Sequence, residues 1–316
     1  MAFYPSISVL TSVYQGDDYL TQFFLNLRNQ TIFPELELVL VLNEPSADEK
    51  KVAKDFQLRA PDQVQILFAH DRETLGSSWN RAWKASRAPY LTMWNVDDRR
   101  VVDSLQRQLS AMEENPEWSL CYGDYLTVSE YGKEQGIHRF TLPYKLANFR
   151  RYFAQGGAFW LFKKSISGII GFFDEQFMVG PDMDLSLRMA VRGLEMGKCD
   201  GLLGHFTDAS VGLSTRDGAH RSAIERTVIQ LRYGVFDKVN YELLEQTKEY
   251  RVDSIKQSTS WIPLSTYLPD LNSYISSRKP LWILGVIRIW FRAAMKRLGL
   301  LDYLHRAQNK YLKREI

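Results

Sequence analysis

The sequence is poor in the features that mark several large protein classes. It has only two cysteines among 316 residues, which excludes the disulfide framework of a small secreted domain and favours a reducing compartment. No stretch approaches the ~18 consecutive apolar residues of a membrane-spanning helix, and the N-terminus lacks the basic and apolar regions of a signal peptide. The phosphate-binding motifs G-x-x-x-x-G-K-S/T and G-x-G-x-x-G are also missing, which argues against P-loop and dinucleotide-binding enzymes. We therefore expect a cytoplasmic protein outside those two classes.

The composition is that of a globular protein, but its charge is unevenly distributed. Hydrophobic residues make up 45% and charged residues 24% of the chain, so it can bury a sizeable core. The formal net charge is +3, yet the segment from Arg278 to the end carries ten basic and two acidic residues. The charge of this tail is +8 and that of the remainder is −5. A uniformly basic nucleic-acid binder would not show this split, and the tryptophan, isoleucine and leucine of the tail favour an anionic membrane surface instead.

Strand-like and helix-like segments alternate in the first hundred residues. Short apolar runs predict strands at residues 6–13, 37–42, 64–68 and 90–94. Helical periodicity predicts helices between them, over residues 19–27, from a capping box at residues 46–49 onward, and over residues 77–86. This order predicts an α/β fold with a mainly parallel sheet and helices on both faces. Ligands then belong at the carboxyl ends of the strands.

The second half divides into further elements and a different C-terminal part. We expect a helix at residues 101–115, a strand at 118–128 and a helix at 182–192 that ends at Gly193. Polar helical stretches follow to Arg251, and then a linker that contains proline and serine. We therefore divide the chain into a domain of residues 1–215 and a helical, basic C-terminal extension of residues 216–316 that associates with a membrane or a partner.

Residues 281–301 of that extension predict an amphipathic helix. At 100° per residue, Arg288, Arg292 and Lys296 form one stripe, opposite a broad apolar face that includes Trp290. Such a helix suits the inner face of an anionic membrane. The alternative is that the apolar face packs on the rest of the chain and the basic stripe is simply solvated.

An acidic turn, Asn95-Val-Asp97-Asp98, follows the fourth expected strand. Two adjacent carboxylates and an amide at the end of a strand can hold a hard divalent cation and leave positions open for phosphate oxygens. The alternative is a helix N-cap, because either aspartate could cap the helix that starts near Val101.

Segments between residues 5 and 210 also occur in the order and spacing of one known family. They are the opening strand and turn at residues 6–20, Leu27-Arg-Asn-Gln-Thr31, the stretch from Gly76 to Leu91, Asn95–Asp98, Phe173-Asp-Glu175, and Pro181–Arg188 with Gly193. This ordered set resembles the family 2 inverting glycosyltransferases, which have the GT-A nucleotide-sugar fold. Asn95–Asp98 stands where the family has its D-x-D-D signature, and Asp182 matches its catalytic base.

The resemblance implies a reaction, a cofactor and a site. The reaction is the inverting, metal-dependent transfer of a sugar from a nucleotide diphosphate sugar, here a UDP-sugar, to a hydroxyl of a glycan or lipid-linked acceptor in polysaccharide biosynthesis. The cofactor is Mn²⁺ or Mg²⁺. The catalytic base is Asp182, which deprotonates the acceptor hydroxyl. The implied nucleotide-sugar site is Thr11, Val13, Asn43, Asn80, Asn95 and Gly157, and the implied metal ligands are Asp97, Asp98 and His205.

The chain departs from the family pattern at three positions. Asn95 replaces the first aspartate of the signature, Pro181 replaces the glutamate of a Glu-Asp pair, and Asn43 stands where an aspartate pair is common. These changes keep open a non-catalytic relative that acts as a membrane-associated assembly partner. A nucleotidyltransferase is the other alternative, although the loop at residues 12–16 lacks the arginine or lysine that such an enzyme needs. For Asp182 itself, the plain alternative is a helix cap, with Arg188 as a surface partner.

Overall fold

The computed structural model describes residues 3–145, 158–208, 218–236 and 238–278, together with four single residues, Ile287, Trp290, Phe291 and Ala294. Gly157 and nearly all of the predicted amphipathic helix lie outside the described residues. The four single residues are helical, and the large side chains of Ile287, Trp290 and Phe291 are exposed. In the described part of the chain, no helix has both the length and the hydropathy needed to cross a membrane.

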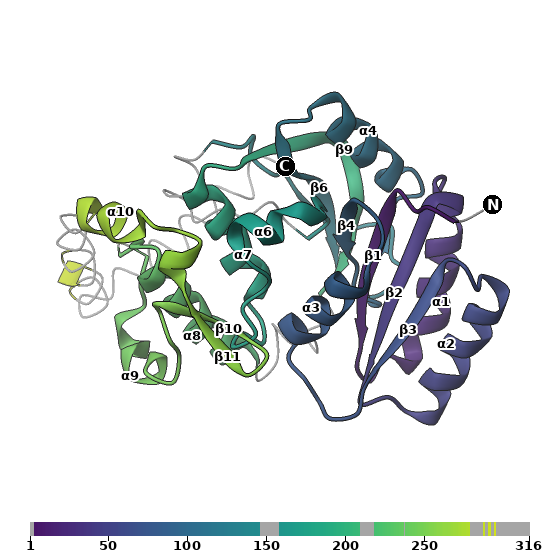
Figure 1. Ribbon diagram of the computed structural model, residues 1–316, viewed down its shortest axis with the longest axis horizontal. Coiled ribbons are helices and arrows are strands. Elements are labelled where there is room, and N and C mark those ends of the chain that lie inside the picture. The colour runs from purple at the N-terminus through teal and green to yellow at the C-terminus, as the bar shows by residue number, and fades with distance from the viewer. Residues whose placement is uncertain are drawn as a thin grey trace.

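One mixed sheet organises the structure (Figure 1). Its strand order is β3-β2-β1-β4-β8-β6-β9-β5, and β7 pairs with β6 at the side. Strands β1 to β4 are mutually parallel, β8 is antiparallel to β4 and β6, and β9 runs parallel to β6. The strands are β1 (Ile7–Val13), β2 (Leu36–Asn43), β3 (Val64–Ala69), β4 (Tyr90–Met93), β5 (Arg99–Arg100), β6 (Trp118–Val128), β7 (Ile137–Arg139), β8 (Leu161–Lys163) and β9 (Glu195–Thr207). The predicted α/β fold class with a mainly parallel sheet is thereby confirmed.

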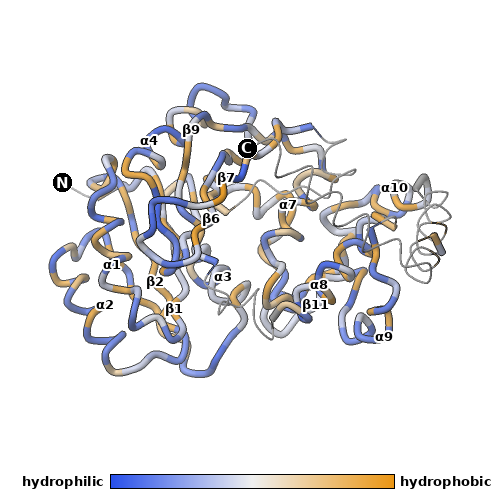
Figure 2. Tube along the Cα trace, turned by 180° about the vertical axis from the view of Figure 1, so that it is seen from behind, coloured by the Kyte–Doolittle hydropathy of each residue, from blue (hydrophilic) through white to orange (hydrophobic). Residues whose placement is uncertain are grey.

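Helices cover both faces of this sheet. The helices in the described residues are α1 (Asp17–Arg28), α2 (Ala47–Arg59), α3 (Leu75–Ala85), α4 (Ser104–Glu114), α6 (Ser167–Ile170), α7 (Pro181–Arg192), α8 (Gly218–Arg232), α9 (Leu244–Thr247) and α10 (Leu271–Arg278). Helices α8, α9 and α10 lie beyond α7, away from the sheet (Figure 1). All eight residues of β2 are buried, as expected for a strand with two covered faces. Val39 and Val41 pack into the core that contains α3 and α7, whereas Leu38 and Leu40 pack into the core that contains α1, α2 and α4. Figure 2 shows the apolar strands inside and the polar outer sides of α1 and α2.

Local signals place the helix ends where the sequence predicts them. At the start of α2, Glu49 N donates to Ser46 Oγ over 3.0 Å, and Ser46 N donates to Glu49 Oε2 over 2.8 Å. This reciprocal pair confirms the predicted capping box. At the end of α7, Gly193 has a φ of 78°, a left-handed conformation that glycine adopts without strain.

The structure differs from the sequence prediction after Arg251. The expected linker is a β-hairpin, β10 (Ser254–Gln257) with β11 (Ser260–Pro263). Ile255 from this hairpin and Leu264 just after it are fully buried in the same core as α3 and α7. The segment is too short and too polar to show a clear alternation in the sequence, but its few apolar residues are the ones that the core buries.

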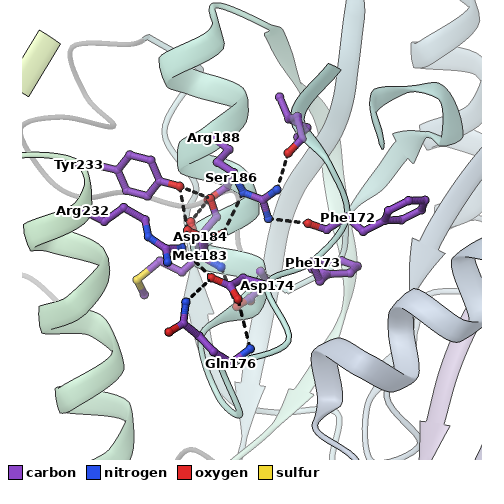
Figure 3. Close-up of polar contacts among 12 residues, drawn as sticks. Phe172, Phe173, Asp174, Gln176, Met183, Asp184, Ser186, Arg188, Arg232 and Tyr233 are labelled. Carbon is purple, nitrogen blue, oxygen red and sulfur yellow. Dashed lines mark hydrogen bonds and ion pairs between the residues drawn. The ribbon is translucent and has the colours of Figure 1, made fainter. Parts of the chain in front are cut away.

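A buried ion cluster joins α7 to α8 (Figure 3). Arg232 of α8 donates from one terminal nitrogen to Asp174 Oδ2 over 2.8 Å and to Asp184 Oδ1 over 2.6 Å. Its other terminal nitrogen donates to the carbonyl oxygens of Arg251 and Ser254, over 2.7 and 2.8 Å. The side chains of all three ions have no exposed surface. One guanidinium therefore ties together α7, α8, the loop before α7 and the start of the hairpin.

Arg188 extends the cluster along α7. It donates from Nε to Asp184 Oδ2 over 2.9 Å, and both side chains are fully buried. Its terminal nitrogens donate to the carbonyl oxygens of Ile170 and Phe172. Burial alone would raise the pKa of Asp184, but the two arginines more than offset it and hold that pKa below the usual value. The alternative in which Arg188 is a surface partner of Asp182 is wrong, because the Arg188 side chain is fully buried and bonds to Asp184 and to the carbonyl oxygens of Ile170 and Phe172.

Removal of Arg232 should destabilise the protein strongly. Arg232→Met leaves the carboxylates of Asp174 and Asp184 without their shared cation, and breaking a buried ion pair in this way costs about 3–5 kcal/mol. Urea unfolding followed by circular dichroism should show this loss in the free energy of unfolding. Arg192→Met, a change at an exposed position in the last turn of α7, should cost less than about 0.5 kcal/mol. Equal stability of the two variants would contradict a structural role for the cluster.

Candidate functional site

The carboxyl ends of β1 and β4 form one edge of the candidate site. Thr11 Oγ1 donates to Trp94 O over 2.9 Å, and Trp94 N donates to Leu10 O over 3.1 Å. These bonds continue the pairing of β1 and β4 beyond the last residue of β4. Thr11 and Val13 are both fully buried, so they shape the floor of this edge. The turn that follows Trp94 is thereby fixed beside β1.

The acidic turn is fastened to β9 through Asp98. Asp98 Oδ1 accepts a hydrogen bond of 3.0 Å from Thr207 N, and Asn95 Nδ2 lies 3.5 Å from Asp98 Oδ2. Asp98 is buried, whereas Asp97 is half-buried. Burial raises the pKa of both carboxyl groups, and the charge of Asp97 raises that of Asp98 further. Two adjacent buried acids favour a proton or a cation between them.

His205 lies at the same corner, within β9. It pairs with Arg99, the residue after Asp98, across β9 and β5. Its Nε2 is 3.3 Å from Glu134 Oε2, while its Nδ1 is buried without a hydrogen-bond partner. Burial lowers the pKa of His205, which favours the neutral imidazole that can bind a metal. Within the described ranges, no three side chains of His, Cys, Asp or Glu form a group that could hold a metal by themselves.

Asp182 is the second residue of α7. Its Oδ1 accepts a hydrogen bond of 2.8 Å from Met183 N. Burial raises the pKa of Asp182 to about 6, and the nearby charge of Glu225 adds to this rise. A carboxylate with such a pKa is ionised at neutral pH and is still basic enough to accept a proton, as general-base catalysis requires.

Tyr125 of β6 is affected by the charge of Asp182 and by that of Asp98 in the acidic turn. Burial raises the pKa of Tyr125, and the charges of both Asp98 and Asp182 raise it as well. Its ring packs edge-on against Phe159 and Phe206. The pKa of this one phenol therefore responds to two acids that are more than eighty residues apart in the sequence.

The side-chain amides of Asn43 and Asn80 form hydrogen bonds with the backbone of nearby loops. Asn43 at the end of β2 donates to Glu73 O over 2.9 Å and accepts from Glu73 N over 3.0 Å. Asn80 of α3 makes the same two-way contact with the backbone of Phe173 and also donates to Glu175 Oε1 over 2.8 Å. Both asparagines are buried. They therefore hold the segments that flank α3 and precede α7.

The starts of α3 and α7 meet next to Asp182. A Cβ atom added to Gly76, in the first turn of α3, would lie 3.4 Å from Pro181 Cβ and 3.2 Å from Asp174 O. A side chain at this position would press on the backbone of Asp174, so glycine allows the close approach. Both helix N-termini carry partial positive charge.

Several residues at the strand ends were not predicted. Tyr14 follows β1, and the guanidinium carbon of Arg72, which follows β3, lies 4.1 Å from the centre of its ring. Gln15 and Glu44, beyond the ends of β1 and β2, both have a φ of 53°. Such a left-handed backbone is costly for residues other than glycine and is frequent at functional sites. The position of Tyr14 directly after a predicted strand was the one available signal in the sequence.

Comparison with known sequences identifies relatives of the N-terminal half. The profile of glycosyl transferase family 2 matches residues 8–169. An uncharacterized glycosyltransferase of Haemophilus influenzae is 26% identical over 111 residues, which are 35% of this chain and 44% of that protein. One of Rickettsia bellii is 26% identical over 132 residues, which are 42% of this chain and 19% of that protein. The matched part thus spans less than half the length of these relatives.

Solved structures share the fold over nearly the whole chain. S. aureus TarS 1–349 in complex with UDP-GlcNAc superposes with a TM-score of 0.59 at 15% identity, over 92% of both chains. The mannosyltransferase PcManGT of Pyrobaculum calidifontis, in complex with GDP-Man and Mn²⁺, gives a TM-score of 0.54 at 13% identity, over 98% of this chain and 88% of that one. At such identities the likeness shows the GT-A-like fold. With the profile match over half of its residues, the chain belongs to glycosyl transferase family 2.

Proposed function

We propose that the protein is an inverting, metal-dependent glycosyltransferase that moves a sugar from a nucleotide diphosphate sugar to a hydroxyl acceptor. The observation that carries this proposal is the position of Asp182 at the start of α7, where Met183 N holds one carboxylate oxygen and burial raises the pKa of the group to about 6. Family membership and the GT-A-like fold support the same reaction class.

The donor nucleotide would lie over the ends of β1 and β2. Val13 and Asn43 end these strands, and the Tyr14–Arg72 pair offers a flat face beside them that suits a nucleobase. Thr11 and Asn80 act through the loops that they hold, and Asn95 would meet the ribose. TarS is in complex with UDP-GlcNAc and PcManGT with GDP-Man, so structural neighbours support a nucleotide-sugar donor. Of these two donor types, we favour a UDP-sugar.

A divalent cation, Mn²⁺ or Mg²⁺, fits the acidic turn. Asp97 would be its main ligand, with Asp98 and His205 beside it. The buried, mutually repelling carboxyl groups and the unpartnered Nδ1 of His205 are the features that fit a cation. Such a cation usually takes one or two carboxylates and completes its shell with substrate phosphates, which agrees with the small donor set. When bound, it would neutralise the charge that develops on the departing diphosphate.

Asp182 would perform the proton transfer. As the acceptor oxygen bonds to the anomeric carbon, the bond from that carbon to the diphosphate oxygen breaks, and the hydroxyl proton passes to Asp182. The Asp182 Oδ2 atom has no partner in the described structure, while Oδ1 is held by Met183 N. One oxygen thus fixes the carboxylate and the other is free to accept the proton.

The acceptor would be a growing glycan or a lipid-linked one. Residues 281–301 would then bring the protein to the inner face of an anionic membrane, as their amphipathic pattern and local positive charge suggest. The exposed side chains of Ile287, Trp290 and Phe291 support this proposal.

Asp182→Asn should remove most of the transfer activity and leave the fold intact. The amide cannot accept the proton, so kcat should fall about 10²–10⁴-fold, while calorimetry with UDP and Mn²⁺ should give an unchanged Kd. In the wild type, kcat/KM should rise with pH to a plateau above a midpoint of about pH 6, because only the ionised carboxylate is a base. Asp55→Asn, at an exposed position in α2, is the matched control. Near-wild-type turnover of Asp182→Asn would refute the assignment.

Asp97→Ala should abolish the metal dependence of nucleotide binding. The variant loses the main hard oxygen ligand, whereas Asn95→Asp adds a further carboxylate to those of Asp97 and Asp98 and should tighten the binding of Mn²⁺. Calorimetry of UDP binding with and without Mn²⁺ measures both effects, with Asp55→Ala as the control for the loss of one carboxylate. If Asp97→Ala keeps its metal dependence, the cation is held elsewhere.

The full-length protein should float with anionic vesicles and not with neutral ones. Replacement of Arg288, Arg292 and Lys296 by glutamate should abolish this binding, since each basic residue near the surface contributes about 1 kcal/mol. Flotation of vesicles with and without phosphatidylglycerol at low salt is the measurement.

A matched triple change on another helix controls for net charge. Lys50, Lys51 and Lys54 are exposed on α2, and their replacement by glutamate should leave flotation unchanged. Wild-type protein that stays at the bottom of the gradient would exclude the membrane role.

A further inference from the structure

A short loop, Met178–Gly180, leads directly into α7 and is bound by a single carboxylate. Glu225 Oε1 accepts a hydrogen bond of 3.0 Å from Met178 N, and Oε2 accepts bonds of 2.8 and 2.9 Å from Val179 N and Gly180 N. Three consecutive backbone donors thus converge on one side chain, two residues before Asp182. Bonds of this kind to an ionised acceptor are about twice as strong as those between neutral groups.

Glu225 is itself rigidly placed. Its residue is 1% exposed, and it lies on α8 seven residues before Arg232. Seven residues are close to two helical turns, so both side chains project from the same face of α8. Arg232 binds Asp184 within α7, and Glu225 binds the loop before α7. Helix α8 therefore contacts the chain at two points, one before Asp182 in the sequence and one after it.

Gly180 packs closely against α8. A Cβ atom added there would lie 3.1 Å from Ile229 Cδ1 and 3.7 Å from Glu225 Oε2. The first contact is tighter than ordinary van der Waals packing, so a larger residue would require the end of the Ile229 side chain to shift by a few tenths of an ångström. The loop and α8 are thus in direct contact beside Glu225.

We propose that Glu225 is a positioning residue for catalysis: its carboxylate fixes the backbone of Met178–Gly180 and so sets where the base Asp182 stands against the acceptor. The proposal rests on the proposed function, because it needs Asp182 to be the base. Glu225 lies in the part of the chain beyond the residues that match the family profile.

The charge of Glu225 has a second effect that can be measured separately from the position of the loop, namely on the pKa of Asp182. This charge raises the pKa of Asp182, after the larger effect of burial. The groups that face Glu225 are the Tyr250 hydroxyl, 3.4 Å from Oε1, the positive charge of Arg221 one turn earlier on α8, and Asp182 itself on α7. Removal of the Glu225 charge therefore lowers the pKa of Asp182.

Two substitutions separate the reach of the side chain from its charge. Glu225→Gln keeps the length but removes the charge and replaces one acceptor oxygen by a donor. Glu225→Asp keeps the charge but is one methylene too short to reach all three donors. Glu245→Gln is the matched control, since Glu245 is an exposed glutamate on the neighbouring helix α9 that pairs only with Lys248 among the described residues.

The first measurement needs no substrate. Hydrogen exchange of the amides of Val179 and Gly180 should be at least about tenfold faster in both Glu225 variants than in the wild type and in Glu245→Gln, because the bonds that protect these amides are lost. Unchanged protection in a folded variant would overturn the proposal. If one variant does not fold, the other carries the same measurement.

The second measurement is the pH profile. We expect kcat to fall about 10–100-fold in both variants, as a misplacement of about 1 Å can cause, with KM for the donor unchanged. The acidic midpoint of kcat/KM should move downward in Glu225→Gln and stay near 6 in Glu225→Asp. A merely structural role would lower stability without this shift.

The outcome for Asp182→Asn separates this proposal from the proposed function. If that variant is inactive while both Glu225 variants keep wild-type kcat and midpoint, the positioning role is wrong and the base assignment stands. If Asp182→Asn is fully active, the proposed function itself fails, and the hydrogen-exchange result then describes a structural contact alone.

Discussion

The pairing of Arg232 with Asp184 is the contact on which the candidate site depends most. Neither ion has access to solvent, and an isolated charge in such a place would be very unfavourable. Loss of either ion alone would leave the other buried without a partner, so the packing of the two helices is strongest when both are present and in register. Because Asp184 is two residues after Asp182 on α7, the placement of the base follows from a contact that has no role in chemistry.

Polar contacts fix the other parts of the same edge in a similar way. Asn43 and Asn80 each close a two-way hydrogen-bond pair with a distant backbone segment, and Asp98 holds the end of β9 through Thr207 N. Apolar packing alone would leave these loops free to adopt several arrangements of similar energy. Directional bonds at low dielectric constant select one of them.

The sequence predicts those parts of the structure that local physics determines. Strand β2 is apolar throughout because both of its faces are covered, and the capping box at Ser46 needs only four consecutive residues. The acidic turn was singled out by its position directly after the fourth expected strand, and Asp182 by its match within an ordered set of motifs. The pKa of Asp182 was not predictable, since burial by distant segments causes most of its rise.

Packing between segments that are distant in the sequence explains why other features were not predicted. The exposed character expected for Arg188 was a fair inference from one helix, and the α8 helix, some forty residues later, reverses it. The hairpin β10–β11 was read as a linker for the same reason. Glu225 carried no signal, because a glutamate on a polar helix is usually solvated, and its three backbone partners lie in a loop without a recognisable pattern.

The raised pKa of Asp182 makes both catalysis and the free energy of unfolding depend on pH in the same range. Because the folded chain holds this proton more tightly than the unfolded chain does, the acid contributes stability below its ordinary titration range and loses that contribution as the pH rises through about 6. A shift of this size corresponds to roughly 1–3 kcal/mol. The ionisation that makes Asp182 a base is therefore the one that weakens the native state. As the pH rises through about 6, the enzyme therefore becomes active and its melting temperature falls. A bound donor would raise the melting temperature again, because a ligand that binds only the folded state stabilises it by mass action.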